Sequence, residues 1–332
     1  MMSRIAAWIW LFLGLAQPVW AQAVPGQQEG LQWLQRVAVA AQKLSYSGTF
    51  VYRNGAQSET SRIVHVANNG VQSEKLEVLD GSPREVIRRN DEVRCYLPEK
   101  QLIIIEQRGS RRAFPALLPL SLAGLGNYYA IRKGGSARIA GFDSQTIRLE
   151  PRDGWRYGHQ FWVEQQSGLL LKAELFDARG EMLESIAFTE LRIGDPIDPD
   201  ALKPSHVPAS GSKEGWQVRQ ARLREIRDPA AWQFRAELPG FRRQAAMVRS
   251  IFDGKGENTR EVLHWVFSDG LAALSVFISP LPPTEGGETG LHSLGAISVA
   301  KRVVDGHQVV VMGDVPPDSV RHFADGIGAR GK

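Results

Sequence analysis

Ser47-Gly-Thr-Phe-Val-Tyr52 runs into Asn54-Gly55, and this pairing of a β-rich run with a tight-turn dipeptide decides the fold. Asn-Gly and Asp-Gly favour two-residue hairpin turns, because the central residues of these turns need positive φ angles. The same pairing recurs at Asn69-Gly70 and Asp80-Gly81. Further β-rich runs follow at residues 86–87, 93–97, 102–105, 136–140, 146–151, 157–164, 169–176 and 182–193. About ten short strands with close turns predict one large antiparallel sheet, curled or barrel-like.

Two features precede this sheet. Residues 30–44 carry apolar side chains at helical spacing, which predicts one amphipathic helix. Before them, Arg4 is followed by an apolar run and then by small residues, which is the order of a secretory signal. We expect residues 1–23 to be a signal peptide, cleaved after Ala21 or Ala23, with an uncleaved anchor as the alternative.

The composition of the chain and the motifs that it lacks exclude several classes of function. The chain has 332 residues and a formal net charge of +4, with its lysines and arginines spread along the sequence. Nucleic-acid binders cluster their basic residues, so we expect no nucleic-acid partner. The single cysteine, Cys95, excludes an intramolecular disulfide. The seven histidines form no close pair, and H-E-x-x-H, G-x-S-x-G, Walker A and C-x-x-C motifs are absent. We therefore expect no metal site, no cofactor and no enzyme.

An apolar stretch interrupts the strands between residues 108 and 129, where Pro115 and Pro119 prevent a long helix. Such an insertion either plugs the sheet or forms a lid over a hydrophobic pocket. Flanking arginines suit an amphiphile with an anionic head, such as a lipid or a lipopolysaccharide-like molecule, and a solvated rim is the alternative. Aromatic residues are crowded over residues 155–162, and the two tryptophans among them are further candidates for lipid contact. Packing in the core is the alternative for these tryptophans. The predicted lipid-binding residues are Phe114, Leu117, Leu118, Leu120, Leu122, Arg108, Arg111, Arg112, Trp155 and Trp162.

A proline-rich run over residues 194–215 predicts a linker between two domains, at residues 24–193 and 216–328. Strand-like runs continue in the second domain, and a closing helix is expected after Pro316-Pro317. An arginine-rich strand beside apolar strands suits an acidic or extended partner segment, and a solvated face is the alternative. The predicted partner-binding residues are Arg242, Arg243, Arg249, Trp265, Phe267 and Phe277.

Several segments resemble the RseB/MucB family and run in that family's order over nearly the whole chain after the signal. They are Ser47-Gly-Thr-Phe-Val-Tyr52, Glu74-Lys-Leu-Glu-Val-Leu-Asp-Gly81, Arg84-Glu-Val-Ile-Arg88, Pro151-Arg-Asp-Gly-Trp-Arg-Tyr-Gly158, Ser167-Gly-Leu-Leu-Leu-Lys172, Glu237-Leu-Pro-Gly-Phe241, Ser268-Asp-Gly-Leu271 and Val310-Val-Met-Gly-Asp-Val-Pro316. Each segment consists largely of turn and core residues, so their ordered combination carries the resemblance.

The resemblance implies an α+β, β-dominated protein. Its first domain would be a large antiparallel unclosed β-barrel with helices, similar to lipoprotein carriers, and its second a smaller α/β domain with an antiparallel sheet. It also implies a periplasmic negative regulator of an envelope-stress sigma factor. Such a regulator binds the periplasmic domain of a transmembrane anti-sigma factor, shields it from site-1 proteolysis, and is relieved by lipid. A periplasmic lipid or lipoprotein carrier and a secreted hydrolase with a dispersed triad are the alternatives. Self-association as a homo-oligomer stays open.

Overall fold

The computed structural model describes residues 25–68, 70–107, 113–206, 215–221, 223–226, 231–252, 259–281 and 286–330. The predicted signal peptide, residues 1–23, lies outside these ranges. None of the described helices is long and apolar enough to cross a membrane.

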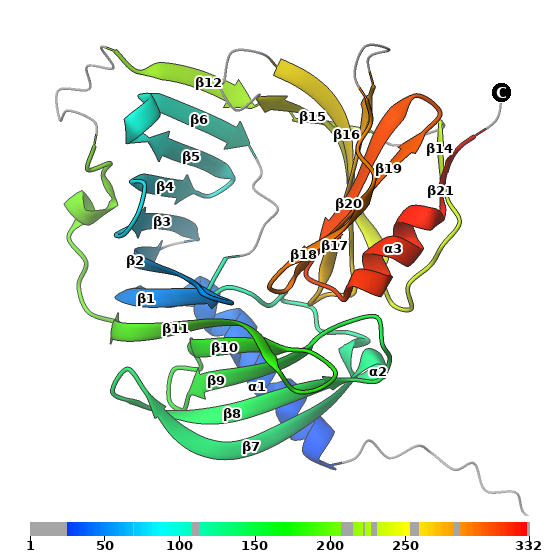
Figure 1. The fold of residues 1–332 in the computed structure, drawn as a ribbon. Coiled ribbons are helices and arrows are strands. Elements are labelled where there is room, and N and C mark those ends of the chain that lie inside the picture. The colour runs from blue at the N-terminus through cyan, green and yellow to red at the C-terminus, as the bar shows by residue number, and fades with distance from the viewer. Residues whose placement is uncertain are drawn as a thin grey trace, which may run out of the picture.

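The larger sheet has twelve strands in the order β12-β6-β5-β4-β3-β2-β1-β11-β10-β9-β8-β7. It curves around one side of the molecule and stays open between its edge strands, β7 and β12 (Figure 1). Its strands are β1 (Tyr46–Asn54), β2 (Gln57–Asn68), β3 (Val71–Val78), β4 (Arg84–Arg89), β5 (Glu92–Leu97), β6 (Leu102–Gln107), β7 (Tyr129–Ile139), β8 (Phe142–Pro151), β9 (Gly158–Glu164), β10 (Leu170–Phe176), β11 (Met182–Ile193) and β12 (Gln217–Ala221). The predicted large, unclosed sheet is confirmed. Two short 3₁₀ turns, η1 (Pro98–Lys100) and η2 (Pro199–Leu202), lie outside it.

Turn chemistry sets the register of the first hairpin. Asn54 pairs with Gln57 across the β1–β2 turn, and Gly55 has a φ of 58°. This left-handed backbone suits glycine, as the Asn-Gly signal predicts. Within β1, Tyr46 and Phe50 are buried, so this face of the strand points into the core.

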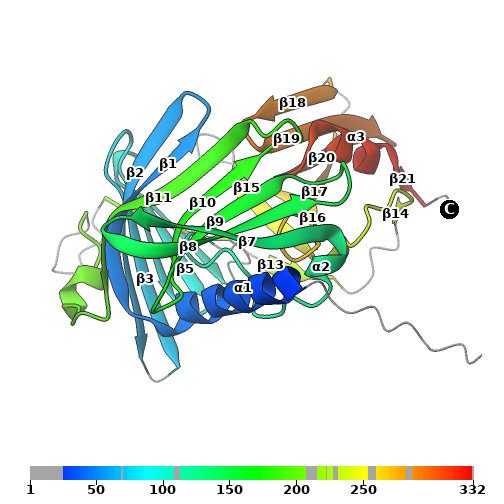
Figure 2. The same ribbon diagram turned by 90° about the horizontal axis from the view of Figure 1, so that it is seen from below.

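Helix α1 (Pro25–Lys43) crosses the sheet from the side of α2 (Leu125–Tyr128) toward β3 (Figure 2). Near its start Gln27 Nε2 donates to Gly126 O at 3.3 Å, and near its end Gln72 Nε2 donates to Gln42 O at 3.1 Å. Its apolar stripe is buried against the sheet, which confirms the predicted amphipathic helix. The first core includes Leu34, Val37, Ala38, Phe50, Ile131, Ile147, Phe161, Leu170 and Phe188.

The smaller sheet has seven strands in the order β13-β15-β16-β17-β20-β19-β18, with every neighbouring pair antiparallel. Its strands are β13 (Leu223–Glu225), β15 (Arg242–Phe252), β16 (Thr259–Ser268), β17 (Ala273–Pro280), β18 (Gly290–Leu294), β19 (Ile297–Val304) and β20 (His307–Gly313). Helix α3 (Pro317–Asp325) buries Val320, Phe323 and Ala324 in this second core. A short pair, β14 (Trp232–Phe234) with β21 (Ile327–Ala329), completes the domain.

The expected start of the second domain at residue 216 needs correction. Strand β12 pairs in parallel with β6 and so belongs to the larger sheet. The reason is that the edge of β6 has unpaired backbone groups, which the chain returning from the linker satisfies. The smaller sheet begins with β13, so the chain passes between the sheets after Ala221.

Candidate functional site

The two domains meet at a buried ion pair. Arg156 Nη1, from the β8–β9 connection, donates to Asp269 Oδ2 at 2.5 Å, and both side chains have 0% exposure. Arg156 Nε donates to Asp153 Oδ1 at 3.0 Å and Nη2 donates to Pro239 O at 2.5 Å. The Tyr129 hydroxyl donates to Asp269 Oδ2 at 3.2 Å. Because a buried charge is costly without a partner, Arg156 and Asp269 fix the second domain against the first.

Aromatic rings enclose this ion pair. The Arg156 guanidinium lies 4.9 Å from the Tyr128 ring centroid. The same ring packs on Gly240 of the second domain, where an added Cβ would lie 2.4 Å from it. Only glycine allows this approach, and its φ of 83° is also left-handed. Burial and the neighbouring carboxylate raise the pKa of Tyr129 well above its ordinary value, so its hydroxyl stays a donor.

Each domain also reaches the core of the other. Leu271 of the second domain packs against the first core, and Trp155 of the first domain packs against the second. Ser319 Oγ donates to Trp155 O at 3.0 Å, and the Trp155 ring lies 4.9 Å from that of His322. The structure therefore places Trp155, predicted to bind lipid, in the domain junction.

The domains also meet away from this ion pair. Arg249 Nη2 on β15 donates to Glu106 Oε1 on β6 at 3.1 Å. The backbone of Gly295 lies directly on the Asn54 side chain of β1, leaving no room for a Cβ. Arg249, predicted to contact a partner, is thus engaged between the domains.

A carboxyl with a strongly shifted pKa lies beside the Asn54 contact. Glu184 is opposite Asn54 in the β1–β11 register. Burial, and then the negative charge of Asp314 in the second domain, raise the pKa of Glu184 to about 7, while a hydrogen bond with Tyr52 opposes the shift. Glu184 therefore changes its charge near neutral pH.

The insertion after β6 fills part of the first core. Phe114 and Leu118 are buried there, and the Phe114 ring lies 5.3 Å from Phe50 and 4.9 Å from Phe188. Leu117 and Leu122 pack partly against the same core, whereas Leu120 is 53% exposed. The described part of the insertion is a plug with one solvent-facing side. Three predicted rim residues lie outside the described ranges: Arg108, Arg111 and Arg112.

Trp162 lies on the other face of the sheet. Its neighbours Phe161 and Val163 are core residues, and alternate side chains of a strand point to opposite faces. Lys172 Nζ lies 4.3 Å from the Trp162 ring centroid. Trp162 therefore does not line the plugged core.

A groove that sequence reasoning missed runs along α1. Its volume is about 490 Å³, within the range of ligand sites, and none of its lining side chains is acidic. The sequence signal is a second face of α1 that carries Arg36 and Lys43 beside Val39 and Ala40. The lining residues are Gln32, Gln35, Arg36, Val39, Ala40, Lys43, Leu44 and Ser167.

The residues predicted to contact a partner are not all on the surface. Trp265 and Phe267 are buried in the second core, at 0% and 9% exposure, which corrects their predicted role. Phe277 is half-buried and stacks on His264 with ring centroids 4.2 Å apart. Arg242 and Arg243 are exposed on β15, so these two remain available to a partner.

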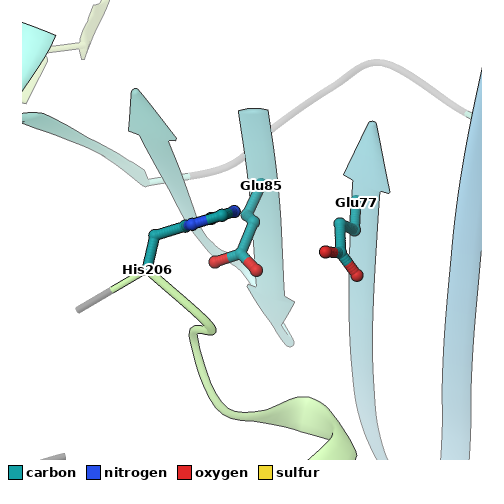
Figure 3. A group of neighbouring side chains, drawn as sticks. All are labelled: Glu77, Glu85 and His206. Carbon is teal, nitrogen blue, oxygen red and sulfur yellow. The ribbon is translucent and has the colours of Figure 1, made fainter. Parts of the chain in front are cut away.

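Glu77, Glu85 and His206 point toward one another, from β3, β4 and the segment after η2 (Figure 3). Their ligand atoms lie within 4.8 Å of one another. However, Lys75 Nζ lies 3.0 Å from the buried Glu85 carboxylate, and Ser205 N donates to both of its oxygens. An ammonium group at this distance opposes a divalent cation. We interpret the cluster as a tether that holds the segment after η2 onto the large sheet.

Fold and junction define a two-domain β protein in which an open, plugged sheet is fixed to a small α+β domain. The chain belongs to the MucB/RseB family. Residues 29–206 match the MucB/RseB N-terminal domain, and residues 227–328 match the MucB/RseB C-terminal domain. The resemblance predicted from the sequence is thereby confirmed.

Relatives match over most of their length. The "Sigma factor AlgU regulatory protein MucB" of Pseudomonas aeruginosa is 30% identical over 308 residues, covering 91% of this chain and 92% of that protein. The "Sigma-E factor regulatory protein RseB" of Escherichia coli is 25% identical, covering 89% of each. The structure of Pseudomonas aeruginosa MucA/MucB has a TM-score of 0.70 at 26% identity, covering 92% of this chain and 100% of that one. MucB in complex with MucA(peri) gives 0.68 at 27% identity, covering 91% and 100%.

Proposed function

We propose that this protein is a periplasmic regulator that binds the periplasmic region of a transmembrane anti-sigma factor and shields it from site-1 proteolysis. The observation that carries the proposal is the full-length similarity to MucB, which has been solved with MucA(peri). The similarity spans both domains, which supports a partner that contacts both of them. Export by the predicted signal peptide would bring the protein to this partner.

The exposed arginines on β15 are the proposed partner contact. Arg242 and Arg243 are followed by the exposed Gln244, and none of these side chains is part of the second core. Arginine pairs with acidic side chains through charge-assisted hydrogen bonds, each worth about 1.5–3 kcal/mol where well formed. Loss of both arginines should therefore weaken partner binding by about 10²-fold.

Calorimetric titration with the anti-sigma periplasmic segment tests this contact. The Arg242→Ala/Arg243→Ala variant should bind far more weakly than the wild type, and raised salt should weaken the wild type too. Arg132→Ala/Arg138→Ala, a matched pair on the exposed edge strand β7, should bind as the wild type does. Wild-type affinity in the β15 variant would move the contact elsewhere. No binding by the wild type would reject the function.

We further propose that an amphiphile relieves the shield. The α1 groove is lined by the apolar Val39 and Leu44 and by two cations, Arg36 and Lys43. Gln35, which also lines the groove, donates from Nε2 to Leu120 O of the insertion at 3.1 Å. An anionic single-chain lipid fits this combination of charge and apolar surface.

Adding lysophosphatidylglycerol to the preformed complex of the protein with the anti-sigma periplasmic segment tests whether an amphiphile relieves the shielding. We expect saturable release of the partner, and a weaker effect of the same lipid on Lys43→Glu. Lipid binding without any partner binding would instead indicate a lipid carrier.

A further inference from the structure

The insertion in the first core and the domain junction belong to one short segment. Residues 113–128 carry the buried Phe114 near their start and end at Tyr128, whose ring lies on Gly240 of the second domain. The next residue, Tyr129, donates its hydroxyl to Asp269 of the junction.

Packing and hydrogen bonds connect the two ends of this segment. Leu118 and Leu125, at 3% and 2% exposure, belong to the same core cluster. At the start of α2, which is a single turn, Leu125 N donates to Leu122 O at 3.2 Å. Tyr128 O accepts from Arg152 N at 2.9 Å. Because cores are close-packed, we expect a change in the packing of Leu118 to reach other members of this cluster, Leu125 among them.

We propose that residues 113–128 are a linkage that couples the packing of Phe114 and Leu118 in the first core to the contacts between the first and second domains. When Phe114 and Leu118 are packed in the core, Tyr128 contacts Gly240 and Tyr129 donates to Asp269. When Phe114 and Leu118 are displaced, α2 shifts and these two contacts weaken. The regulatory consequence rests on the proposed function: an amphiphile that unseats the plug would release a partner that needs both domains in place.

Hydrogen exchange in the full-length protein tests the linkage. Leu271 N and Ala272 N both donate to Asp269 Oδ1 at 2.9 Å, and they lie in the second domain at the junction. In Leu118→Ala these two amides should exchange about tenfold faster, equivalent to about 1.4 kcal/mol. The amide of Val311, in the middle of the smaller sheet, should keep its wild-type rate, since the second domain itself is untouched.

Leu120→Ala is the matched control, because it makes the same truncation in the same segment at an exposed position. Its junction amides should exchange as in the wild type. If Leu118→Ala fails to fold, Leu118→Val serves with the same readout. Wild-type exchange in both Leu118 variants, or equal acceleration in Leu120→Ala, would overturn the linkage.

The partner titration separates this inference from the proposed function. Faster junction exchange together with weaker partner binding in Leu118→Ala supports both halves of the inference. Faster exchange with unchanged partner affinity overturns its regulatory half. If the wild type binds no partner, the proposed function fails, and the exchange result still decides the linkage.

Discussion

The junction ion pair makes a quantitative prediction for a double-mutant cycle of Arg156→Met and Asp269→Ala. Both side chains are completely buried, and removing one member of such a pair costs about 3–5 kcal/mol. Asp269→Ala leaves the guanidinium with Asp153 at 3.0 Å, so the lower end applies, about 3 kcal/mol. Arg156→Met leaves a buried carboxylate that still accepts from Tyr129, and its expected cost is similar, about 3 kcal/mol.

The two effects should not add. Either single substitution already removes the attraction between the two charges, so the double variant should cost about as much as one single variant. The expected coupling energy is therefore about 3 kcal/mol, at the upper end for contacting residues. It arises from the interaction of the two charges rather than from lost packing.

Equilibrium urea unfolding of the four proteins measures the cycle, followed by circular dichroism and by tryptophan fluorescence. Glu59→Gln is the control, since its partner Arg84 is 45% exposed and surface pairs contribute about 0–1 kcal/mol. An Asp269→Ala cost as small as that of the control, or costs that simply add, would refute the reasoning that this pair holds the domains together.

Three further outcomes follow from burial and charge. Phe114→Ala should lower the free energy of unfolding by about 3–5 kcal/mol, and the exposed Leu120→Ala by no more than about 0.5 kcal/mol, in urea titrations. The pKa of Glu184 is raised to about 7 from 4.5, so the contribution of this carboxyl to stability falls as pH rises between these values; the stability difference between the wild type and Glu184→Gln, followed against pH, should show this slope. Burial lowers the pKa of His159 from 6.5 to about 3, so the contribution of this imidazole falls as pH drops below 6.5 and offsets that of Glu184 in the wild type; the difference between the wild type and His159→Leu should show the opposite slope in pH-dependent thermal unfolding.

Local chemistry made much of the fold predictable. The Asn54-Gly55 turn and the alternation that follows it lie where the sequence predicts a hairpin, because turn geometry and strand period are set by neighbouring residues. Helix α1 starts earlier than residue 30, since Pro25 is compatible with a first helical turn. The closing helix after Pro316 is likewise readable from its capping proline and its apolar stripe.

Long-range pairing was not predictable. Arg156 and Asp269 are 113 residues apart, and each lies in a turn whose sequence gives no sign of a distant partner. The alternation around Trp265 shows an apolar face but not whether that face is covered, and the second core buries it. Strand β12 joins β6 in parallel because an open edge needs hydrogen bonds, which no local pattern records.

Protection of the anti-sigma periplasmic segment from its site-1 protease is the measurement that tests the central claim most directly. The mature full-length protein is titrated into a cleavage reaction, and the intact segment is quantified over time. We predict saturable protection that levels off near equimolar protein and is lost in Arg242→Ala/Arg243→Ala. Cleavage at the same rate with and without the folded wild-type protein would contradict the account.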